Sequence, residues 1–457
     1  MVTASMTSID RSIINVSLPV MRRDFQVELN EIEWVVTAYM LAFLFALPLM
    51  NWLKSRVGYY TLMMVCLTVF IVGSICCSLA PTLSALIFCR ALQAVSGGIL
   101  TPMSMSILSE TLPPEEKGSA IAWWGIGNVT GLAIGPTLGG FLSHYFGWPF
   151  IFYINIPLGV WALVLVIRYL SFLKEVPRQQ IKFDFIGYIL FLSFILTAQQ
   201  WVWMISTYPL THIFTWVFLL IVVGFLYLYI RSANKENALL DLNVFRYALF
   251  NRSAMVIFLR SVALFGGMFY LPFLLQGELG YSEMETGLLM LPNALLVLVT
   301  RPYSGKLADK GKIRNITLLG IAMLAVSFLF FATLKPGVAS WWIVLIMIFR
   351  GIGMGFLVAP VSTSLLGSVQ QHQTATATTL NSLILQLGGS LGIAVSGVFY
   401  QLLRDHYLPS HSAVEADHFA LKGSFLIAAV LIMAAFIPAW KLPEGGMKKT
   451  EVKDLPQ

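Results

Sequence analysis

The chain has 457 residues, of which 58% are hydrophobic and only 11% are charged, and its formal net charge is +7. Soluble domains carry roughly 25% charged residues, so this composition excludes an ordinary water-soluble protein. A positive net charge can indicate a nucleic-acid partner, but Lys and Arg in the cytoplasmic loops of a membrane protein explain it more simply, and no nucleic-acid partner is expected. The 4 Cys lie in apolar runs without metal-ligand neighbours, so no metal site is expected.

Apolar runs of about 20 residues, each long enough to cross a bilayer as a helix, recur along the chain. They predict fourteen transmembrane helices, at about 1–20, 31–52, 61–79, 82–107, 118–143, 149–170, 185–205, 213–231, 251–275, 285–305, 315–334, 341–365, 376–402 and 421–440. An even number of spans puts both termini on one side of the membrane. If that side is the cytoplasm, about 17 of the 29 Lys and Arg lie in cytoplasmic segments and about 5 in outside loops, as the positive-inside rule requires.

The two ends of the chain echo each other. LIFCRALQAVSGG (86–98) is similar to IMIFRGIGMGF (346–356), because both place an Arg near mid-membrane and follow it with small residues and a Pro. NWLKSRVGYYTLMM (51–64) is likewise similar to GKLADKGKIRNITLLG (305–320). The first six spans therefore correspond to the last six, with two spans inserted between them. Two repeated six-helix halves are typical of secondary transporters, whose substrate site lies between the halves.

These segments resemble the major facilitator superfamily and, more narrowly, its fourteen-span drug:proton antiporters of the EmrB/QacA type. The resemblance covers nearly the whole chain and is carried by IDRSIINVSLP (9–19), GLAIGPTLGG (131–140), WPFIFYINIPLGV (148–160), LPFLLQGELGYSEMETGLLMLP (271–292) and TTLNSLILQLGGSLGIAVSG (378–397). It implies an all-α integral membrane protein with the major facilitator fold, two six-helix bundles plus two extra central helices.

This architecture predicts four parts. They are an N-terminal six-helix bundle (1–170), two inserted helices with a cytoplasmic linker (171–250), a C-terminal six-helix bundle (251–440) and a cytoplasmic tail (441–457). The expected location is the cell (inner) membrane, with both termini in the cytoplasm.

Asp10 is a carboxylate well inside a predicted span, and an ionisable group in lipid is a functional hypothesis by default. Its helical face is mostly polar and could line a wet cavity, since it also carries Thr3, Thr7, Ile14 and Ser17. Arg11 points about 100° away, so the partner of Asp10 must come from another helix. The resemblance places spans 1 and 4 side by side, which makes Arg90 the candidate. Burial favours a protonated carboxyl group and a nearby Arg favours the ionised one, so this pair could couple proton entry to substrate exit. The alternative is a static ion pair.

The resemblance also implies that spans 1, 4, 9 and 12 line the substrate cavity. Besides Asp10 and Arg90, these spans carry Arg260 and Arg350. Arg260 could instead snorkel or bind backbone carbonyls. Three Arg against one Asp make the expected cavity positive, which favours neutral, zwitterionic or anionic amphiphiles over dications.

Further candidates for substrate contact are Asn381 and Gln386 in span 13 and Trp123 in span 5. The two amides could instead link helices, and Trp123 could simply face lipid.

Span 5 carries a glycine at every fourth position, Gly127, Gly131, Gly135 and Gly139, accompanied by Pro136 and Gly140. Such a stripe lets another backbone approach closely, and the proline can kink the helix. The stripe resembles the antiporter motif and is expected to pack against the other half of the protein and seal the cavity. Ordinary packing of small residues is the alternative.

The loop after span 2 resembles the gating loop of the family through Arg56 and Gly58. Asn51 and Ser55 replace the first Gly and the Asp of that motif, which puts its usual charge lock in doubt. The second copy of the loop keeps the motif at Gly305, Asp309 and Lys310.

No P-loop, HExxH or Ser-His-Asp pattern is present in the sequence, so no enzyme activity is expected, and the energy source implied is the proton motive force rather than a cofactor. The resemblance implies proton-coupled antiport that exports drug-like or amphiphilic small molecules. The expected partners are that substrate, protons, the lipid bilayer and, in a cell with two membranes, a periplasmic adaptor protein. Two alternatives stay open: a dedicated exporter of a metabolite, lipid or siderophore, and a non-transporting membrane receptor or scaffold.

Overall fold

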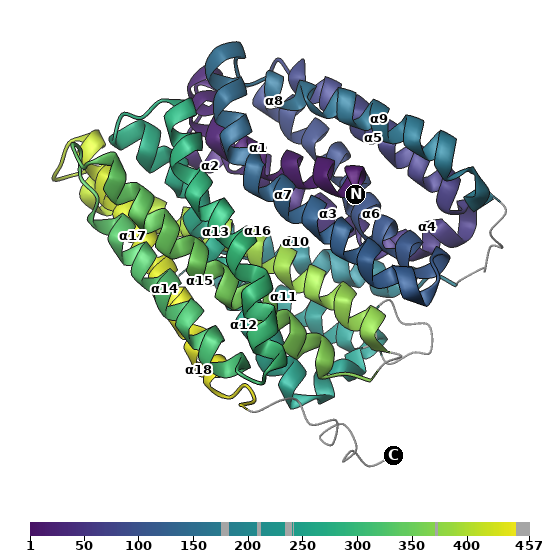
Figure 1. Ribbon diagram of the computed structural model, residues 1–457. Coiled ribbons are helices and arrows are strands. Elements are labelled where there is room, and N and C mark those ends of the chain that lie inside the picture. The colour runs from purple at the N-terminus through teal and green to yellow at the C-terminus, as the bar shows by residue number, and fades with distance from the viewer. Residues whose placement is uncertain (175–181, 208–211, 234–239, 241, 371–372, 445–457) are drawn as a thin grey trace. The chain divides into compact units, whose positions relative to one another are not determined.

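The computed structural model describes residues 1–174, 182–207, 212–233, 240, 242–370 and 373–444, and every regular element among them is a helix (Figure 1). The chain forms two compact units, Met1–Phe183 with Leu275–Ala294, and Asp184–Leu274 with Leu295–Gln457. The sequence predicts bundles at 1–170 and 251–440, which follow the repeat. The compact units differ from that division because a segment of the second half joins the first unit.

The first unit contains the N-terminal helices. These are α1 (Val2–Phe25), α2 (Leu29–Ile32), α3 (Trp34–Ala46), α4 (Leu49–Val57), α5 (Tyr59–Ser78), α6 (Leu83–Thr111), α7 (Pro114–Phe146), α8 (Phe150–Tyr153), α9 (Asn155–Tyr169) and the 3-10 turn Ser171–Lys174. Residues with special backbone roles separate them. Gly58 has a φ of 82° between α4 and α5, a conformation that favours glycine. Thr82 caps α6 by accepting a hydrogen bond from the backbone N of Ala85.

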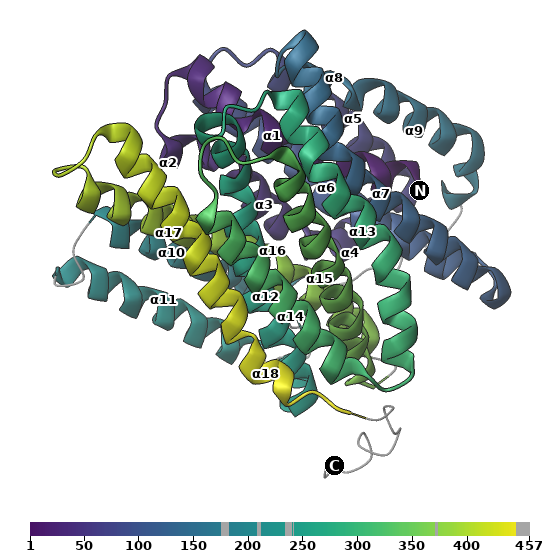
Figure 2. The same ribbon diagram turned by 60° about the vertical axis from the view of Figure 1, so that its left-hand side comes forward.

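The second unit contains α10 (Phe185–Thr207), α11 (Ile213–Ser232), the 3-10 turn Leu242–Arg246, α12 (Ala248–Phe273), α14 (Ile313–Thr333), α15 (Ser340–Gly367), α16 (Thr374–Tyr407), α17 (Ala413–Ala434) and α18 (Phe436–Trp440). A π-helical segment, Leu274–Glu278, follows α12. The long helix α13 (Glu283–Asp309) begins in the first unit and continues into the second after Ala294. Helices α10 and α11 lie side by side in both ribbon views (Figure 2).

Twelve helices among the described residues are long and apolar enough to cross a membrane. The sequence-based count of fourteen is therefore not supported by this criterion. The two predicted spans outside the twelve, 1–20 and 118–143, correspond to α1 and α7. Both helices are long enough, but α1 carries charges at Asp10, Arg11, Arg22, Arg23 and Asp24, and α7 is rich in glycine, so their mean hydropathy is low.

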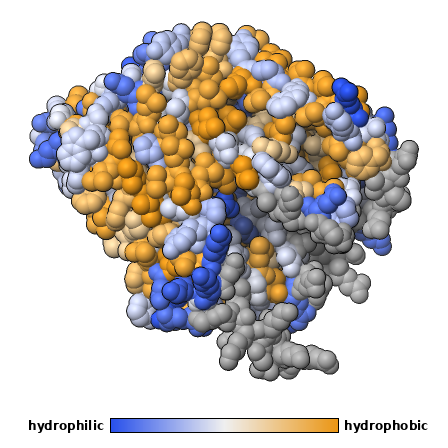
Figure 3. Space-filling model, in the orientation of Figure 1, coloured by the Kyte–Doolittle hydropathy of each residue, from blue (hydrophilic) through white to orange (hydrophobic). Residues whose placement is uncertain are grey.

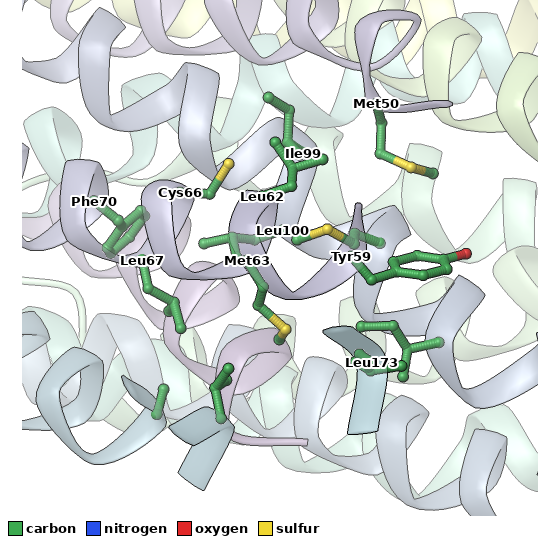
Figure 4. Packing of buried hydrophobic residues seen from close by; sticks show 14 of the residues in the cluster. Met50, Tyr59, Leu62, Met63, Cys66, Leu67, Phe70, Ile99, Leu100 and Leu173 are labelled. Carbon is green, nitrogen blue, oxygen red and sulfur yellow. The ribbon is translucent and has the colours of Figure 1, made fainter. Parts of the chain in front are cut away.

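Buried apolar side chains hold the helices of the first unit together. One cluster joins Met50 of α4, Leu67 and Phe70 of α5, and Leu100 of α6 (Figure 4). Apolar side chains are also abundant on the outside: the face drawn in Figure 3 is largely hydrophobic. On α11 the exposed residues include Ile213, Trp216, Leu220 and Val223. A soluble monomer rarely exposes such a contiguous apolar surface, and a helix facing lipid does.

Candidate functional site

The first unit contains a fully buried ion pair between Asp10 of α1 and Arg90 of α6. Arg90 Nη1 donates to Asp10 Oδ2 at 2.9 Å, and the two side chains are 0% and 1% exposed. The other carboxylate oxygen, Oδ1, accepts hydrogen bonds from Gln93 Nε2 and from Asn155 Nδ2 of α9, each at 2.8 Å. The single carboxylate is thus held by donors from two other helices.

Gln93 connects the members of this site. Its Oε1 accepts a hydrogen bond from Arg90 Nη1 at 2.7 Å, and its Nε2 also donates to Ser74 Oγ of α5 at 2.8 Å. Gln93 follows Arg90 by three positions, so both lie on one face of α6. The site therefore links four helices, α1, α5, α6 and α9, through a buried polar network.

Aromatic rings enclose the guanidinium group of Arg90. Its Cζ lies 4.0 Å from the ring centroid of Tyr39 on α3 and 5.7 Å from that of Phe152 on α8. Cation–π attraction to these rings offsets part of the cost of removing the charge from water. Arg11 points elsewhere, as its helical position predicts, and its Cζ lies 5.0 Å from the ring of Phe43.

The Asp10 carboxylate accepts hydrogen bonds at both oxygens, one at Oδ2 and two at Oδ1. Most of its roughly four acceptor positions are therefore occupied by donors of the first unit. A buried ion pair contributes little net stability, because desolvation offsets the Coulombic attraction. Removing one partner, in contrast, leaves an uncompensated buried charge and is strongly destabilising.

Gln93→Leu is expected to destabilise the protein by about 1–3 kcal/mol, because it leaves buried groups of Asp10, Arg90 and Ser74 short of partners. Thermal unfolding of the purified full chain in detergent measures the effect. Gln401→Leu is the matched control, since Gln401 donates to Asp405 at an exposed position. Equal unfolding temperatures for the two variants would contradict the network.

The glycine stripe of α7 packs against α1. A Cβ added at Gly131 would lie 2.6 Å from the Ser5 carbonyl oxygen, and one at Gly139 would overlap the Ile13 carbonyl oxygen. Ser12 Oγ also donates across this contact to the Gly131 carbonyl at 3.3 Å. The sequence led us to expect that the stripe contacts the other half. That expectation is wrong for these glycines, because small residues of α1 supply a complementary surface within the same unit.

The neighbouring face of α7 contacts α13. A Cβ at Gly140 would overlap the Glu283 carbonyl oxygen, and one at Gly287 would lie 2.8 Å from the Pro136 carbonyl oxygen. Thr137 Oγ1 donates to the Gly287 carbonyl at 2.9 Å. Pro136 and Gly140 therefore contact a segment from the second half of the chain, one that belongs to the first compact unit. On the face that contacts α1, Gly127 packs against Ser5 and Gly135 packs against Ser12.

The other residues predicted to contact substrate have different environments. Arg260 of α12 and Arg350 of α15 are buried in the second unit, and so is Gln386 of α16. Asn381 is half-buried on α16. Trp123 is 58% exposed on α7, which places its side chain on the outside of the first unit rather than among the buried site residues.

The two loops predicted to act as gates lie at helix ends. Arg56 is exposed near the end of α4, with its Cζ 6.0 Å from the ring of Trp52, and Gly58 forms the turn. Ser55, which stands where the family motif has Asp, is buried and donates to the Trp52 carbonyl. Gly305 has open space around it on α13, and Lys310 is exposed after its end, whereas the side chain of Asp309 lies outside the described residues.

Sequence reasoning paired Asp10 with Arg90 but missed Gln93, Asn155 and Ser74. A usable signal existed for Gln93, because an amide three positions from a mid-membrane Arg shares its helical face. Asn155 interrupts the apolar run FIFYINIPLGV, and a polar residue at that depth also needs a partner.

Comparisons with known proteins agree with this architecture. The family model described as Major Facilitator Superfamily matches residues 1–393. The chain is 31% identical over 444 residues to the riboflavin transporter RibZ of Clostridioides difficile (strain 630), covering 94% of this chain and 93% of that protein. It is 28% identical over 404 residues to the multidrug export protein EmrB of Escherichia coli (strain K12), covering 86% and 77%.

Among solved structures, the chain resembles a bacterial homolog of the human lysosomal transporter Spinster in an inward-facing, occupied conformation. The TM-score is 0.65 at 15% identity, and the match covers 96% of this chain and 94% of that one. At this identity the likeness concerns the fold alone.

Proposed function

Because the chain belongs to the Major Facilitator Superfamily and is therefore a multi-pass membrane transporter, we propose that it is a proton-coupled antiporter that exports drug-like or amphiphilic small molecules from the cytoplasm. The observation that carries the proposal is the buried Asp10–Arg90 pair with its donors Gln93 and Asn155. The proton motive force drives the cycle.

In this mechanism Asp10 and Arg90 alternate between two states. When the pair is closed, as found here, Arg90, Gln93 and Asn155 donate hydrogen bonds to the carboxylate. When α1 and α6 shift so that Arg90 withdraws, the buried carboxylate takes up a proton from the outside, since burial without a counterion favours the neutral acid. Closure of the pair on the cytoplasmic side of the cycle expels the proton, and substrate moves in the opposite direction.

The packing of α1 against α7 supports a movement of α1 during the transport cycle. The four glycines place no side chain of α7 in its contact with α1, so the two backbones approach closely. We infer that α1 moves along this surface when the pair opens.

We further propose that α1 and α7 cross the membrane with the twelve apolar helices, which gives the fourteen-span topology of EmrB/QacA-type antiporters. Ser5, Ser8 and Ser12 of α1 pack against the glycine stripe of α7, and Asp10 bonds to α6 and α9, so these polar groups do not face lipid. The positive-inside bias then places both termini in the cytoplasm of a cell whose inner membrane holds the protein, where a periplasmic adaptor could extend the path.

The second candidate function is dedicated export or transport of one metabolite. It is favoured by the match to the riboflavin transporter, which covers 94% of this chain and 93% of that relative, more of both proteins than the EmrB match.

The experiment compares retention of a chemically broad panel of dyes and drugs, with riboflavin included, in efflux-deficient bacteria that express the chain or an empty vector. Lower retention of several unrelated compounds, reversed by an uncoupler, is the expected result. Export of riboflavin alone would favour the second candidate. If the protein reaches the membrane and no compound depends on the uncoupler, proton-coupled multidrug export is wrong.

A further inference from the structure

We propose that Arg350 of α15 forms a subsite for the acidic group of the substrate, so that the preferred cargo is an amphiphile with a carboxylate or a similar anion. This proposal rests on the transport function proposed above and deepens it by naming the substrate class.

The buried charged side chains described in the second unit are all positive. Arg260 and Arg350 are 4% and 1% exposed, and no Asp or Glu is buried among the described residues of this unit. Nη1 of Arg260 and both Nε and Nη2 of Arg350 are buried without a hydrogen-bond acceptor. Buried charges without partners are costly, and proteins keep them mainly where a ligand completes them.

A comparison with the first unit shows which partner Arg350 lacks. Arg90 and Arg350 occupy similar motifs, and each guanidinium lies over an aromatic ring, 4.0 Å from Tyr39 and 4.6 Å from Phe328 respectively. Arg90 has a carboxylate partner on α1. In the second unit Arg350 has the same kind of aromatic contact, but no buried acid is present among the residues described there.

Glycine contacts identify the position where that acid would stand. A Cβ at Gly131 would lie 2.6 Å from the Ser5 carbonyl oxygen and 2.9 Å from Ser8 Cβ; a Cβ at Gly388 would lie 2.9 Å from the Phe258 carbonyl oxygen and 2.9 Å from Ser261 Cβ. By this match Ser8 corresponds to Ser261. The residue two positions after Ser8 is Asp10, and the residue two positions after Ser261 is Ala263. The place of the carboxylate is taken by a methyl group.

Two contacts show how α12, which carries Arg260, lies beside the surroundings of Arg350. The ring of Phe328 that underlies Arg350 packs against Gly267 of α12, seven residues and about 10 Å along the helix axis from Arg260. Ser253 of α12 and Ser364 of α15 share a hydrogen bond of 2.9 Å, which ties the two helices together. Guanidinium groups bind planar anions through paired, charge-assisted hydrogen bonds. Both side chains are covered here, so the anion enters in another state of the transport cycle.

The test uses the purified full chain in detergent and measures thermal unfolding with three probes of similar size: 1-naphthoate, 1-naphthamide and 1-naphthylmethylammonium. We expect naphthoate to raise the unfolding temperature more than the other two. Arg350→Gln should weaken its apparent affinity at least about tenfold, since it removes a charge-assisted contact. Arg252→Gln is the matched control on α12, because Arg252 is exposed and donates only to the Lys441 carbonyl at 2.9 Å.

A second readout separates a binding role from a structural one. Without probe, Arg350→Gln should be at least as stable as the parent, because it removes an uncompensated buried charge. Ala263→Asp should abolish the naphthoate effect by supplying an internal counterion. A naphthoate shift no larger than the naphthamide shift, a shift that survives Arg350→Gln, or a marked loss of stability in Arg350→Gln would each overturn the proposal.

The assay also keeps the two proposals apart, since it needs no proton gradient. Naphthoate binding with these variant effects, together with export that ignores uncouplers, would leave the subsite standing and refute antiport. Uncoupler-sensitive export without any preference for the acid would refute the subsite alone.

Discussion

Asp10→Asn is expected to reduce uphill export to the background of cells without the protein. Asn keeps the shape of the side chain and can still accept a hydrogen bond from Arg90, but it binds no proton between the two states of the cycle. The substitution also leaves Arg90 as an uncompensated buried charge, so the protein should lose about 3–5 kcal/mol of stability. Substrate-driven proton movement in proteoliposomes and thermal unfolding of the same preparation measure the two effects.

A double variant, Asp10→Asn with Arg90→Gln, distinguishes proton coupling from a static ion pair. Removing both charges should recover most of the lost stability, because the two sites are in direct contact and their effects are not additive. Export should stay absent. If export returns together with stability, the pair only fixes helix packing.

Gly139→Ala is expected to destabilise the first unit by about 1–3 kcal/mol and to impair export, because the added methyl group overlaps the Ile13 carbonyl of α1 and neither backbone has room to yield. Ile13 is one helical turn from Asp10, so a displaced α1 also misaligns the carboxylate with Arg90. Thermal unfolding and dye retention report the two effects.

Gly125→Ala is the matched control on the same helix. A Cβ at Gly125 has no heavy atom within 4 Å, so this variant should be neutral or more stable by up to about 1 kcal/mol, as for Gly→Ala in an open helix. Similar behaviour of the two variants would show that the tight α1–α7 contact does not matter.

The sequence was informative where a residue type contrasts with its surroundings. Charged residues in apolar runs singled out Asp10, Arg90, Arg260 and Arg350, since burying a charge is costly enough to require a reason. Helix-length apolar runs located most spans for the same reason. The same hydropathy argument was least secure for α1, because its polar face is buried against other helices rather than exposed.

Partner identity could not be predicted from sequence spacing. A four-residue glycine repeat defines a stripe on α7, but it does not say which helix fills it, and the structure places α1 there. Amides such as Gln93 and Asn155 are common in helices of transporters, so their convergence on one carboxylate became visible only through the fold. Ala263 attracts no notice in the sequence at all, because its meaning depends on the corresponding acid in the other half.

One feature of the fold bears on how such proteins can be recombined. Residues 275–294 follow the central linker in the chain yet belong to the compact unit of the N-terminal helices. Gln276 Nε2 donates to the Val16 carbonyl at 2.7 Å, and Thr137 donates to the Gly287 carbonyl at 2.9 Å. A chimera that joins two relatives at the linker would therefore pair α1 and α7 of one parent with a foreign segment. Gene-shuffling crossovers placed at both 274 and 295 keep the native partners together.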